Sequence, residues 1–288
     1  MSNVFLFSVD LEDIRFLMED GRERPERVAA NVHAYLEWLK GHGFRCTFFV
    51  VGDVAEAYPF LIREIFEKGH EIACHGYRHI PLDQQTPDQF RSLLTANRNA
   101  LTRAGAKNIQ GFRAPIFSLT EKTAWAYAVL KDLGFTYSSS VLPAKNPFYG
   151  WPEFGPCPKM INGIFEIPMT VRRFGPYRVP AAGGVYFRVL PAFFIRRSSH
   201  KFLGADRPLI GYFHPYDIDT EQERFMHPEI NDSRFYNYLM YYNRKNVFKR
   251  LDAIIKRGFT ICPYAEYIRR GTQGLIKEEP GEKIHEPG

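Results

Sequence analysis

Hydrophobic and polar positions alternate along the first half of the chain in a regular order. Short runs rich in β-branched and aromatic residues, such as 4–9 and 44–51, predict buried strands. Segments of helical length with apolar residues on one face, such as 25–43 and 54–68, lie between and after these runs. This repeated strand and helix order predicts an α/β fold with a parallel sheet or barrel.

The same pattern predicts the remaining elements. We expect further strands at 70–74, 109–112, 135–139, 165–169, 185–187, 209–213 and 259–262. We expect further helices from Pro87 with Thr86 as N-cap, from Thr120 to Gly134, at 191–202 and at 234–257. On the last of these helices, an aromatic-rich row favours helix packing over a platform for sugars; the row contains Phe235, Tyr236, Tyr238, Leu239, Tyr241 and Tyr242.

The stretch 141–164 changes character, because prolines and aromatic residues replace the periodic pattern. It predicts a long loop, either a surface excursion held by its own aromatic side chains or a lip beside a substrate site. The chain shows no internal repeat and no linker that would divide it. We therefore expect a single domain over 1–270 and a disordered, charged tail over 271–288.

Polar candidates follow several of the predicted strands at the point where each strand ends. Asp10 follows the first strand, His75 the third, Arg113 the fourth and His214 a late one. The carboxyl ends of parallel strands meet at one edge of the sheet, where active sites form in such folds. We therefore expect these side chains to lie together at a site.

The histidines His75 and His79 have a spacing that can place both imidazoles on one side of a turn, where they could hold a divalent metal. The first strand supplies nearby carboxylates at Asp10, Glu12 and Asp13. Two histidines and one carboxylate form a catalytic zinc-type site with room for water, and a further carboxylate can take the proton of that water. Either Glu12 or Asp13 can be the third ligand.

Five motifs follow one another along the chain: Phe7-Ser-Val-Asp10-Leu-Glu12-Asp13, Thr47-Phe-Phe-Val50, Gly69-His-Glu-Ile72 with His75 and His79, Phe112-Arg-Ala-Pro115 and Phe213-His-Pro215. Motifs in this order resemble those of the polysaccharide deacetylase (chitooligosaccharide deacetylase homology, carbohydrate esterase family 4-like) superfamily, in the subgroup with a D-x-E-D first motif. The resemblance implies a distorted (β/α) barrel of about seven parallel strands in one domain. It also implies a divalent metal, with Zn²⁺ favoured over Co²⁺, Mn²⁺ or Ni²⁺, and removal of an N-acyl group from an amino sugar.

Carried over by position, the resemblance assigns Asp10 as catalytic base and His75 and His79 as metal ligands. It assigns Arg113 as the residue that tunes the base, and His214 as the general acid.

Two positions depart from the family pattern. Leu11 stands where a second Asp usually binds the metal, which leaves Glu12 or Asp13 for that role. Ser138 stands where an Asp often supports the acidic histidine, and Asp217 is the residue that could replace it.

Charge and composition narrow the partners. The formal net charge of +6 is spread along the chain instead of forming basic runs, which favours a phosphate-bearing substrate or a peripheral membrane contact over nucleic acid. No apolar stretch is long enough for a transmembrane span, and the amino terminus lacks the pattern of a signal peptide. The four cysteines lack metal-type spacing and are expected to be free thiols in the cytoplasm.

Together these features predict a metal-dependent carbohydrate N-deacetylase in the cytoplasm. Its expected substrate is an N-acylated amino sugar on a nucleotide or lipid carrier, a precursor of surface polysaccharide such as lipopolysaccharide. The alternatives are a related C–N hydrolase, acting on a cyclic ureide or on a formyl group of a lipid-linked sugar, and a catalytically inactive sugar-binding protein. The sequence does not identify the sugar, the acyl group, the metal or the oligomeric state.

Overall fold

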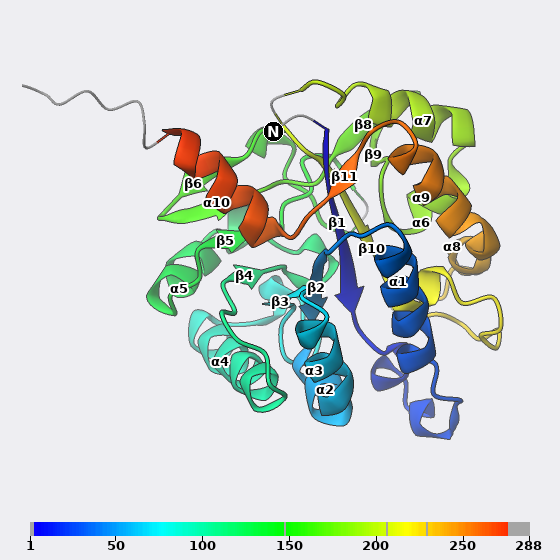
Figure 1. The fold of residues 1–288 in the computed structure, drawn as a ribbon. Helices are drawn as coiled ribbons and strands as arrows, with labels where there is room; N and C mark the ends of the chain where they lie inside the picture. Colours follow the sequence, from blue (N-terminus) through cyan, green and yellow to red (C-terminus); the bar gives the residue numbers. More distant parts are fainter. Residues whose placement is uncertain (1–2, 147, 206, 229, 276–288) are drawn as a thin grey trace, which may run out of the picture.

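A curled, mostly parallel sheet forms the centre of the protein, and helices lie around it (Figure 1). The computed structural model describes residues 3–146, 148–205, 207–228 and 230–275. Along the sheet the strands follow the order β10 (Leu209–Phe213), β1 (Val4–Leu11), β2 (Thr47–Val50), β3 (Glu71–Cys74), β4 (Gly111–Phe112), β5 (Tyr137–Ser138), β7 (Ile164–Glu166) and β6 (Lys159–Ile161), and β11 (Thr260–Ile261) pairs with the start of β1. Neighbours are parallel except β6 and β7. The predicted distorted (β/α) barrel is thus confirmed as a half-barrel.

Helices connect most of the strands. The α-helices are α1 (Val28–Gly41), α2 (Gly52–Ala57), α3 (Pro59–Glu67), α4 (Pro87–Arg103), α5 (Ala126–Asp132), α6 (Gly184–Val189), α7 (Ala192–His200), α8 (Arg234–Tyr241), α9 (Val247–Ile255) and α10 (Tyr264–Leu275). Short 3-10 helices are η1 (Ile14–Leu17), η2 (Gly21–Glu23), η3 (Leu82–Gln84), η4 (Pro115–Phe117), η5 (Glu121–Thr123), η6 (Pro152–Phe154), η7 (Pro215–Asp217) and η8 (Arg244–Asn246). In the described part of the chain, no helix combines the length and the apolar character that crossing a membrane requires.

Local chemistry explains where these helices begin. Helix α4 starts with the predicted Thr86 N-cap and Pro87, and the side chains of Thr86 and Gln89 complete a capping box. The predicted helix 54–68 is instead two helices, because Tyr58 precedes Pro59 and has φ −128° and ψ 53°. A residue before proline is disfavoured in the helical region, so the chain breaks there and restarts.

Side chains of β1 alternate between the two sides of the curled sheet, as successive residues of a strand must. The odd-numbered residues of 5–11 pack in the large cluster between the sheet and the helices. Val4 and Leu6 belong to a second cluster on the inner side. Ser8 and Asp10 continue this inner row toward the carboxyl end of the strand. The alternation therefore brings Asp10 into the interior of the half-barrel.

Helix α10 begins at the amino-terminal ends of β2 and β3. Tyr264 N donates to Thr47 Oγ1 (2.9 Å), and Ala265 N donates to Glu71 Oε2 (3.1 Å). Because Thr47 and Glu71 are the first residues of their strands, α10 covers this end of the inner cluster. The predicted disordered tail from 271 is wrong for residues 271–275, which are helical, and its remainder, 276–288, lies outside the described residues.

Two predicted elements of the second half are wrong. The expected strand 185–187 is helix α6, since an apolar run of this length fits either element and Gly184, at φ +55°, turns the chain into a helix. The expected long helix 234–257 is interrupted at Asn243, which has left-handed φ and ψ angles. Helices α8 and α9 therefore lie on either side of this break.

The prediction that the aromatic row of α8 packs against other elements is also wrong. Phe235 is 67% exposed and Tyr238 58% exposed, and Tyr236 and Tyr242 are each 42% exposed, so most of the row faces outward instead of packing. The hairpin of β8 (Val171–Phe174) and β9 (Tyr177–Pro180) was missed, because its strands carry arginines and are half-exposed without a clear apolar alternation.

Candidate active site

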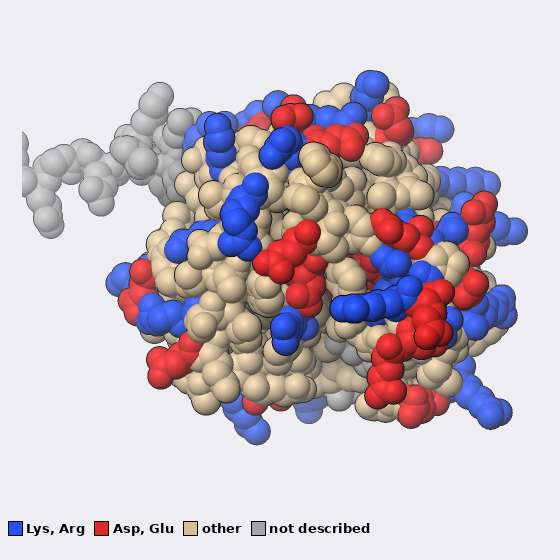
Figure 2. Space-filling model, turned by 90° about the horizontal axis from the view of Figure 1, so that it is seen from below, with Lys and Arg blue, Asp and Glu red and all other residues tan. Residues whose placement is uncertain are grey.

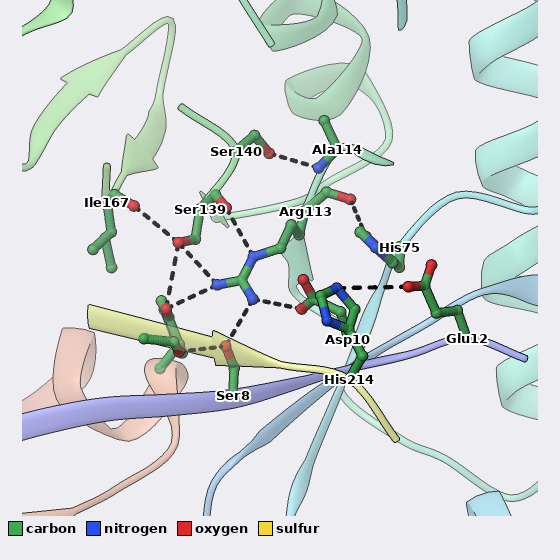
Figure 3. Close-up of polar contacts among 12 residues, drawn as sticks. Ser8, Asp10, Glu12, His75, Arg113, Ala114, Ser139, Ser140, Ile167 and His214 are labelled. Atoms are coloured by element: carbon green, nitrogen blue, oxygen red, sulfur yellow. Dashed lines mark hydrogen bonds and ion pairs between the residues drawn. The ribbon is translucent and has the colours of Figure 1, made fainter. Parts of the chain in front are cut away.

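The side chains predicted at strand ends meet at the carboxyl end of the sheet (Figure 3). Asp10 lies in β1, Glu12 directly after it, and His214 directly after β10. These residues line one cavity of about 170 Å³, and its wall also contains both His75 and His79. Arg113 follows β4 and is fully buried behind Asp10.

Hydrogen bonds to residues from distant parts of the chain hold the Arg113 guanidinium in place. Its Nη1 donates to Asp10 Oδ1 (2.5 Å) and Ser8 Oγ (2.7 Å), its Nε to the carbonyl of Ser139 (3.0 Å), and its Nη2 to Tyr264 Oη (2.9 Å). Burial lowers the pKa of Arg113, but the adjacent Asp10 outweighs it and the pKa is raised. The guanidinium is therefore charged, and its bond fixes the orientation of the Asp10 carboxylate.

His75, His79 and Glu12 form a group that can hold a metal, because one ligand atom from each lies within 4.8 Å of the others and all are buried. His75 Nδ1 is 2.9 Å from the carbonyl of Arg113. Since a carbonyl only accepts, Nδ1 carries the hydrogen and Nε2 keeps its lone pair for a metal. Burial lowers the pKa of His75 to about 4, which favours the neutral form that ligation requires.

Glu12 completes this group. Its Oε2 lies 2.9 Å from His79 Nε2, yet among the described residues no donor meets hydrogen-bond geometry at that buried oxygen. Its Oε1 accepts from Tyr216 Oη (3.2 Å). Burial raises the pKa of Glu12, but the neighbouring histidines, His79 first, lower it further and hold it well below its usual range. An ionised carboxylate and two imidazoles are a donor set that fits zinc or a similar divalent ion.

Asp13, the other carboxylate offered by the sequence, is turned away from the histidines. It begins η1, and its Oδ2 accepts from Arg15 Nη2 (2.7 Å) and Tyr58 Oη (3.0 Å). Asp13 is not part of the group formed by Glu12, His75 and His79. The geometry therefore favours Glu12 as the carboxylate partner of the histidines.

A carboxylate lies beside the imidazole of His214, although Ser138 stands at the position where the family often has a supporting aspartate. Its Nδ1 is 3.0 Å from Asp217 Oδ2, and Asp217 Oδ1 accepts from Arg188 Nε (2.9 Å). Burial lowers the pKa of His214, but the hydrogen bond with Asp217 and nearby carboxylates raise it above its ordinary value. For Asp217, burial raises the pKa, whereas Arg188 and His214 lower it to about 2. Asp217 thus replaces the missing aspartate.

Ser138 and Glu166 instead make contacts that organise the segment after β5. Ser138 Oγ lies 2.7 Å from Ser140 Oγ. Glu166 Oε1 accepts from the backbone N–H groups of Ser140 (2.8 Å) and Val141 (3.0 Å), so it fixes the segment after β5. Ser139 in this segment contacts Arg113. Glu166 is therefore fully buried, and its contacts are structural.

Several residues that organise the site were missed from the sequence. Tyr264 and Ser8 contact Arg113 but carry no spacing that marks them, since their contacts join distant parts of the chain. Arg188, which anchors Asp217, lies on α6, directly after the segment 185–187 that was expected to be a strand. Only the inward alternation of β1 could have identified Ser8.

The face of the protein at this end of the sheet has mixed charge (Figure 2). Arg24 pairs with Asp20 and Glu223, and Arg27 pairs with Asp219 and Glu221. Acidic side chains therefore neutralise much of the basic charge beside the site. A face of this kind lacks the continuous basic surface that nucleic-acid binding requires.

Comparison with known proteins agrees with the fold and the motifs. A polysaccharide deacetylase family model matches residues 16–138, and a domain of unknown function (DUF3473) matches residues 139–268. The chain is 30% identical over 92 residues to a peptidoglycan-N-acetylglucosamine deacetylase of Bacillus cereus, covering 32% of this chain and 34% of that relative. It is 36% identical over 81 residues to a chitooligosaccharide deacetylase of Sinorhizobium fredii, covering 28% of this chain and 38% of that relative.

Residues 16–138 thus match the polysaccharide deacetylase superfamily in sequence as well as in the motifs described above. A crystal structure from Mycobacterium smegmatis, assigned to the polysaccharide deacetylases, has the same fold, with a TM-score of 0.60 at 16% identity over 100% of this chain and 98% of that one. The matched region spans about a third of the length of each curated relative. The subgroup defined by the D-x-E-D motif stays a prediction.

Proposed function

We propose that this protein is a metal-dependent hydrolase that removes the N-acetyl group of an amino sugar. The observation that carries the proposal is the convergence of Asp10, His214 and the Glu12, His75 and His79 group on one cavity. The match of residues 16–138 to the polysaccharide deacetylase family supports it, as does the chemistry of the groups. A base, an acid and a metal site together are what hydrolysis of an amide bond needs.

The residues take the following roles in the proposed mechanism. A divalent ion held by Glu12, His75 and His79 would polarise the acyl carbonyl and lower the pKa of water. Asp10, oriented by Arg113, takes a proton from the water molecule that attacks the acyl carbon. His214 carries a proton on Nε2 because Nδ1 faces Asp217, and it gives that proton to the amine nitrogen as the C–N bond breaks. The products are acetate and a free amino sugar.

The carrier, the metal and the compartment belong to the same proposal. We assign Zn²⁺ as the metal, because two imidazoles and one carboxylate with an open position suit it. We assign a nucleotide-linked or lipid-linked precursor of surface polysaccharide, such as lipopolysaccharide, as the substrate class; the net charge of +6 supports a phosphate-bearing carrier. The four free cysteines support the cytoplasm, where thiols stay reduced.

Of the two alternatives, these contacts argue only against the inactive sugar-binding protein. An inactive sugar-binding protein was suggested by Leu11 and Ser138, at positions where the family usually has carboxylates. Glu12 and Asp217 lie where those carboxylates are needed, so the groups required for hydrolysis are present. A related C–N hydrolase would use the same groups, so only the reaction product distinguishes it from an N-deacetylase.

Acetate release tests the proposal. The full chain, supplied with Zn²⁺, should release acetate from N-acetylglucosamine oligomers or from nucleotide-linked and lipid-linked N-acetyl sugars. Asp10→Asn should lower kcat by at least about 100-fold, because it removes the base. Asp132→Asn, a 58% exposed aspartate paired with Arg91, is the matched control and should keep the rate. Release of formate from an N-formyl sugar, or hydrolysis of a cyclic ureide, without acetate release would favour the alternative hydrolase.

A further inference from the structure

A second cavity of about 180 Å³ adjoins the active-site cavity. The two cavities share part of their wall, and the shared residues are Ile116, Phe117, Val185, Tyr212 and Met240. A group bound beside His214 and Glu12 could therefore extend into this second cavity without crossing the protein interior. We call it the apolar cavity.

The lining of the apolar cavity differs from that of the active site. Outside the shared wall it contains Leu142, Pro180, Ile230 and Leu239, with aromatic rings between them, and among its described lining residues none carries a charge. Its amide, Asn146, accepts a hydrogen bond at Oδ1 from the backbone N–H of Phe148 (3.0 Å). Sugar hydroxyls and phosphates need polar partners, whereas this lining offers mainly carbon.

A third cavity, which also borders Glu12 and Tyr216, provides a contrast. It has a volume of about 150 Å³ and is lined by Arg15, Arg24 and Arg27 and by acidic residues, in addition to apolar residues such as Val28 and Phe225. The active site thus has a charged side and an apolar side. A substrate that occupies both must itself have a polar and an apolar part.

Unusual backbone geometry builds the shared wall. Ile116 and Phe117 have φ of +53° and +55°, in the left-handed region that branched and bulky residues rarely adopt. Gly183 lies so close to Tyr212 that an added Cβ would be 2.4 Å from its carbonyl oxygen. Strained backbone of this kind is found where a protein holds a binding surface in place. Here it presents apolar side chains to both cavities.

The apolar lining continues to the surface. Phe148 and Tyr236, which line the cavity, are 41% and 42% exposed. On helix α8, the neighbouring Phe235 and Tyr238 are 67% and 58% exposed, but neither lines the cavity. A chain longer than the cavity could therefore reach solvent past Phe148 and Tyr236.

We propose that the apolar cavity is a subsite for an alkyl or prenyl chain attached to the amino-sugar substrate. A cavity of about 150 Å³ lined by such residues holds a benzene molecule, so this one takes a chain segment of about six carbons. The inference rests on the proposed function and names the substrate class of that same site. The chain is carried either on the acyl group or on the anomeric carbon, and the experiment separates these sources.

The test compares matched glucosamine derivatives with the full, Zn²⁺-loaded protein. The pairs are the methyl and hexyl glycosides of N-acetylglucosamine, and the N-acetyl and N-hexanoyl forms of methyl glucosaminide. Amine release should give a kcat/KM at least about tenfold higher for the longer member of one pair, mainly through a lower KM, because each buried methylene favours binding. The pair that shows the effect identifies the position of the chain.

Two variants of adjacent residues on α8 provide the control. Leu239→Trp places a larger side chain in the apolar cavity and should bring the ratio of kcat/KM between long and short substrates close to one. Tyr238→Trp changes a 58% exposed neighbour that does not line the cavity and should keep the ratio. Far-UV circular dichroism establishes that both variants are folded.

Binding of the hexyl and methyl glycosides of glucosamine, measured by calorimetry, separates failure of the subsite from failure of the function. If no derivative is hydrolysed but the hexyl glycoside binds at least about tenfold more tightly, and Leu239→Trp removes that preference, the subsite stands and the proposed function falls. Equal kcat/KM and equal binding for long and short members in both pairs would overturn the subsite, whether or not acetate is released.

Discussion

At the scale of single residues, strand alternation explains which carboxylates reach the site. Asp10 and Glu12 lie on the same side of β1 and its extension, and Leu11 between them packs in the outer cluster. Asp13 is the N-cap of η1, and its carboxylate accepts hydrogen bonds from Arg15 and Tyr58. The sequence could predict that one of Glu12 and Asp13 joins the histidines. It could not choose between them, because the choice depends on where β1 ends.

Zinc affinity distinguishes these carboxylates. Glu12→Gln should weaken Zn²⁺ binding by at least about 100-fold, since loss of even an indirect partner of a metal ligand costs 10–100-fold. Asp13→Asn should bind Zn²⁺ like the unaltered protein, because its oxygens face Arg15 and Tyr58. Competition with a chromogenic chelator measures both affinities. Weaker binding in Asp13→Asn alone would refute the assignment.

The pH dependence of hydrolysis reports on His214. Its pKa is raised, in large part by Asp217, and a general acid works only while protonated, so kcat should fall as the pH rises through that raised pKa. Asp217→Asn removes a cause of the raised pKa, and the alkaline limb should move to lower pH. Asp252→Asn, a 39% exposed aspartate near His42, is the control. An alkaline limb that stays in place in Asp217→Asn would contradict the role of Asp217.

At the scale of elements, the first half of the chain was predicted well because its strands are buried and its helices amphipathic. The Thr86 capping box and the strands β1, β2 and β3 follow directly from local pattern. The second half was predicted less well. Helix α6 reads as a short apolar run, and α8 exposes its aromatic row, so neither has the periodicity that packing imposes.

Glycine substitutions test how closely the backbone at Gly183, the N-cap of helix α6, packs against Tyr212. Gly183→Ala should lower the free energy of unfolding by about 1–3 kcal/mol, because the new Cβ would meet backbone atoms of Tyr212 at 2.4 and 2.5 Å. Gly41→Ala, in helix α1 with no atom within 4 Å of the new Cβ, should instead raise it by up to about 1 kcal/mol. Urea unfolding measures both. Equal stability of the two variants would show that the approach to Tyr212 is not constraining.

At the scale of the whole molecule, the two matched family regions form one sheet. The boundary between residues 138 and 139 falls at the end of β5, yet β5 from the first region pairs with β7 from the second, and β1, which precedes the first region, pairs with β10 and β11 from the second. Arg113 from the first region also bonds Ser139 and Tyr264 from the second. The sequence could not predict these long-range pairings, because they depend on how the sheet curls. They support the proposal of one catalytic domain over 1–270.

Truncation tests whether the two matched regions fold as one domain. A fragment of residues 1–138 lacks β10, β11 and two partners of Arg113, Ser139 and Tyr264, so it should show no cooperative thermal transition by near-UV circular dichroism. The full chain should unfold in a single transition. A fragment that unfolds cooperatively on its own would contradict the single-domain proposal.

The central claim is that Glu12, His75 and His79 hold the metal on which N-deacetylation depends. Acetate release from an N-acetylated amino sugar should be measured on one preparation as purified, after chelation, and after one equivalent of Zn²⁺ is restored. The account predicts that chelation abolishes acetate release, that Zn²⁺ restores it, and that Glu12→Gln is not restored. Acetate release that persists without metal, or that Zn²⁺ restores equally in Glu12→Gln, would contradict it.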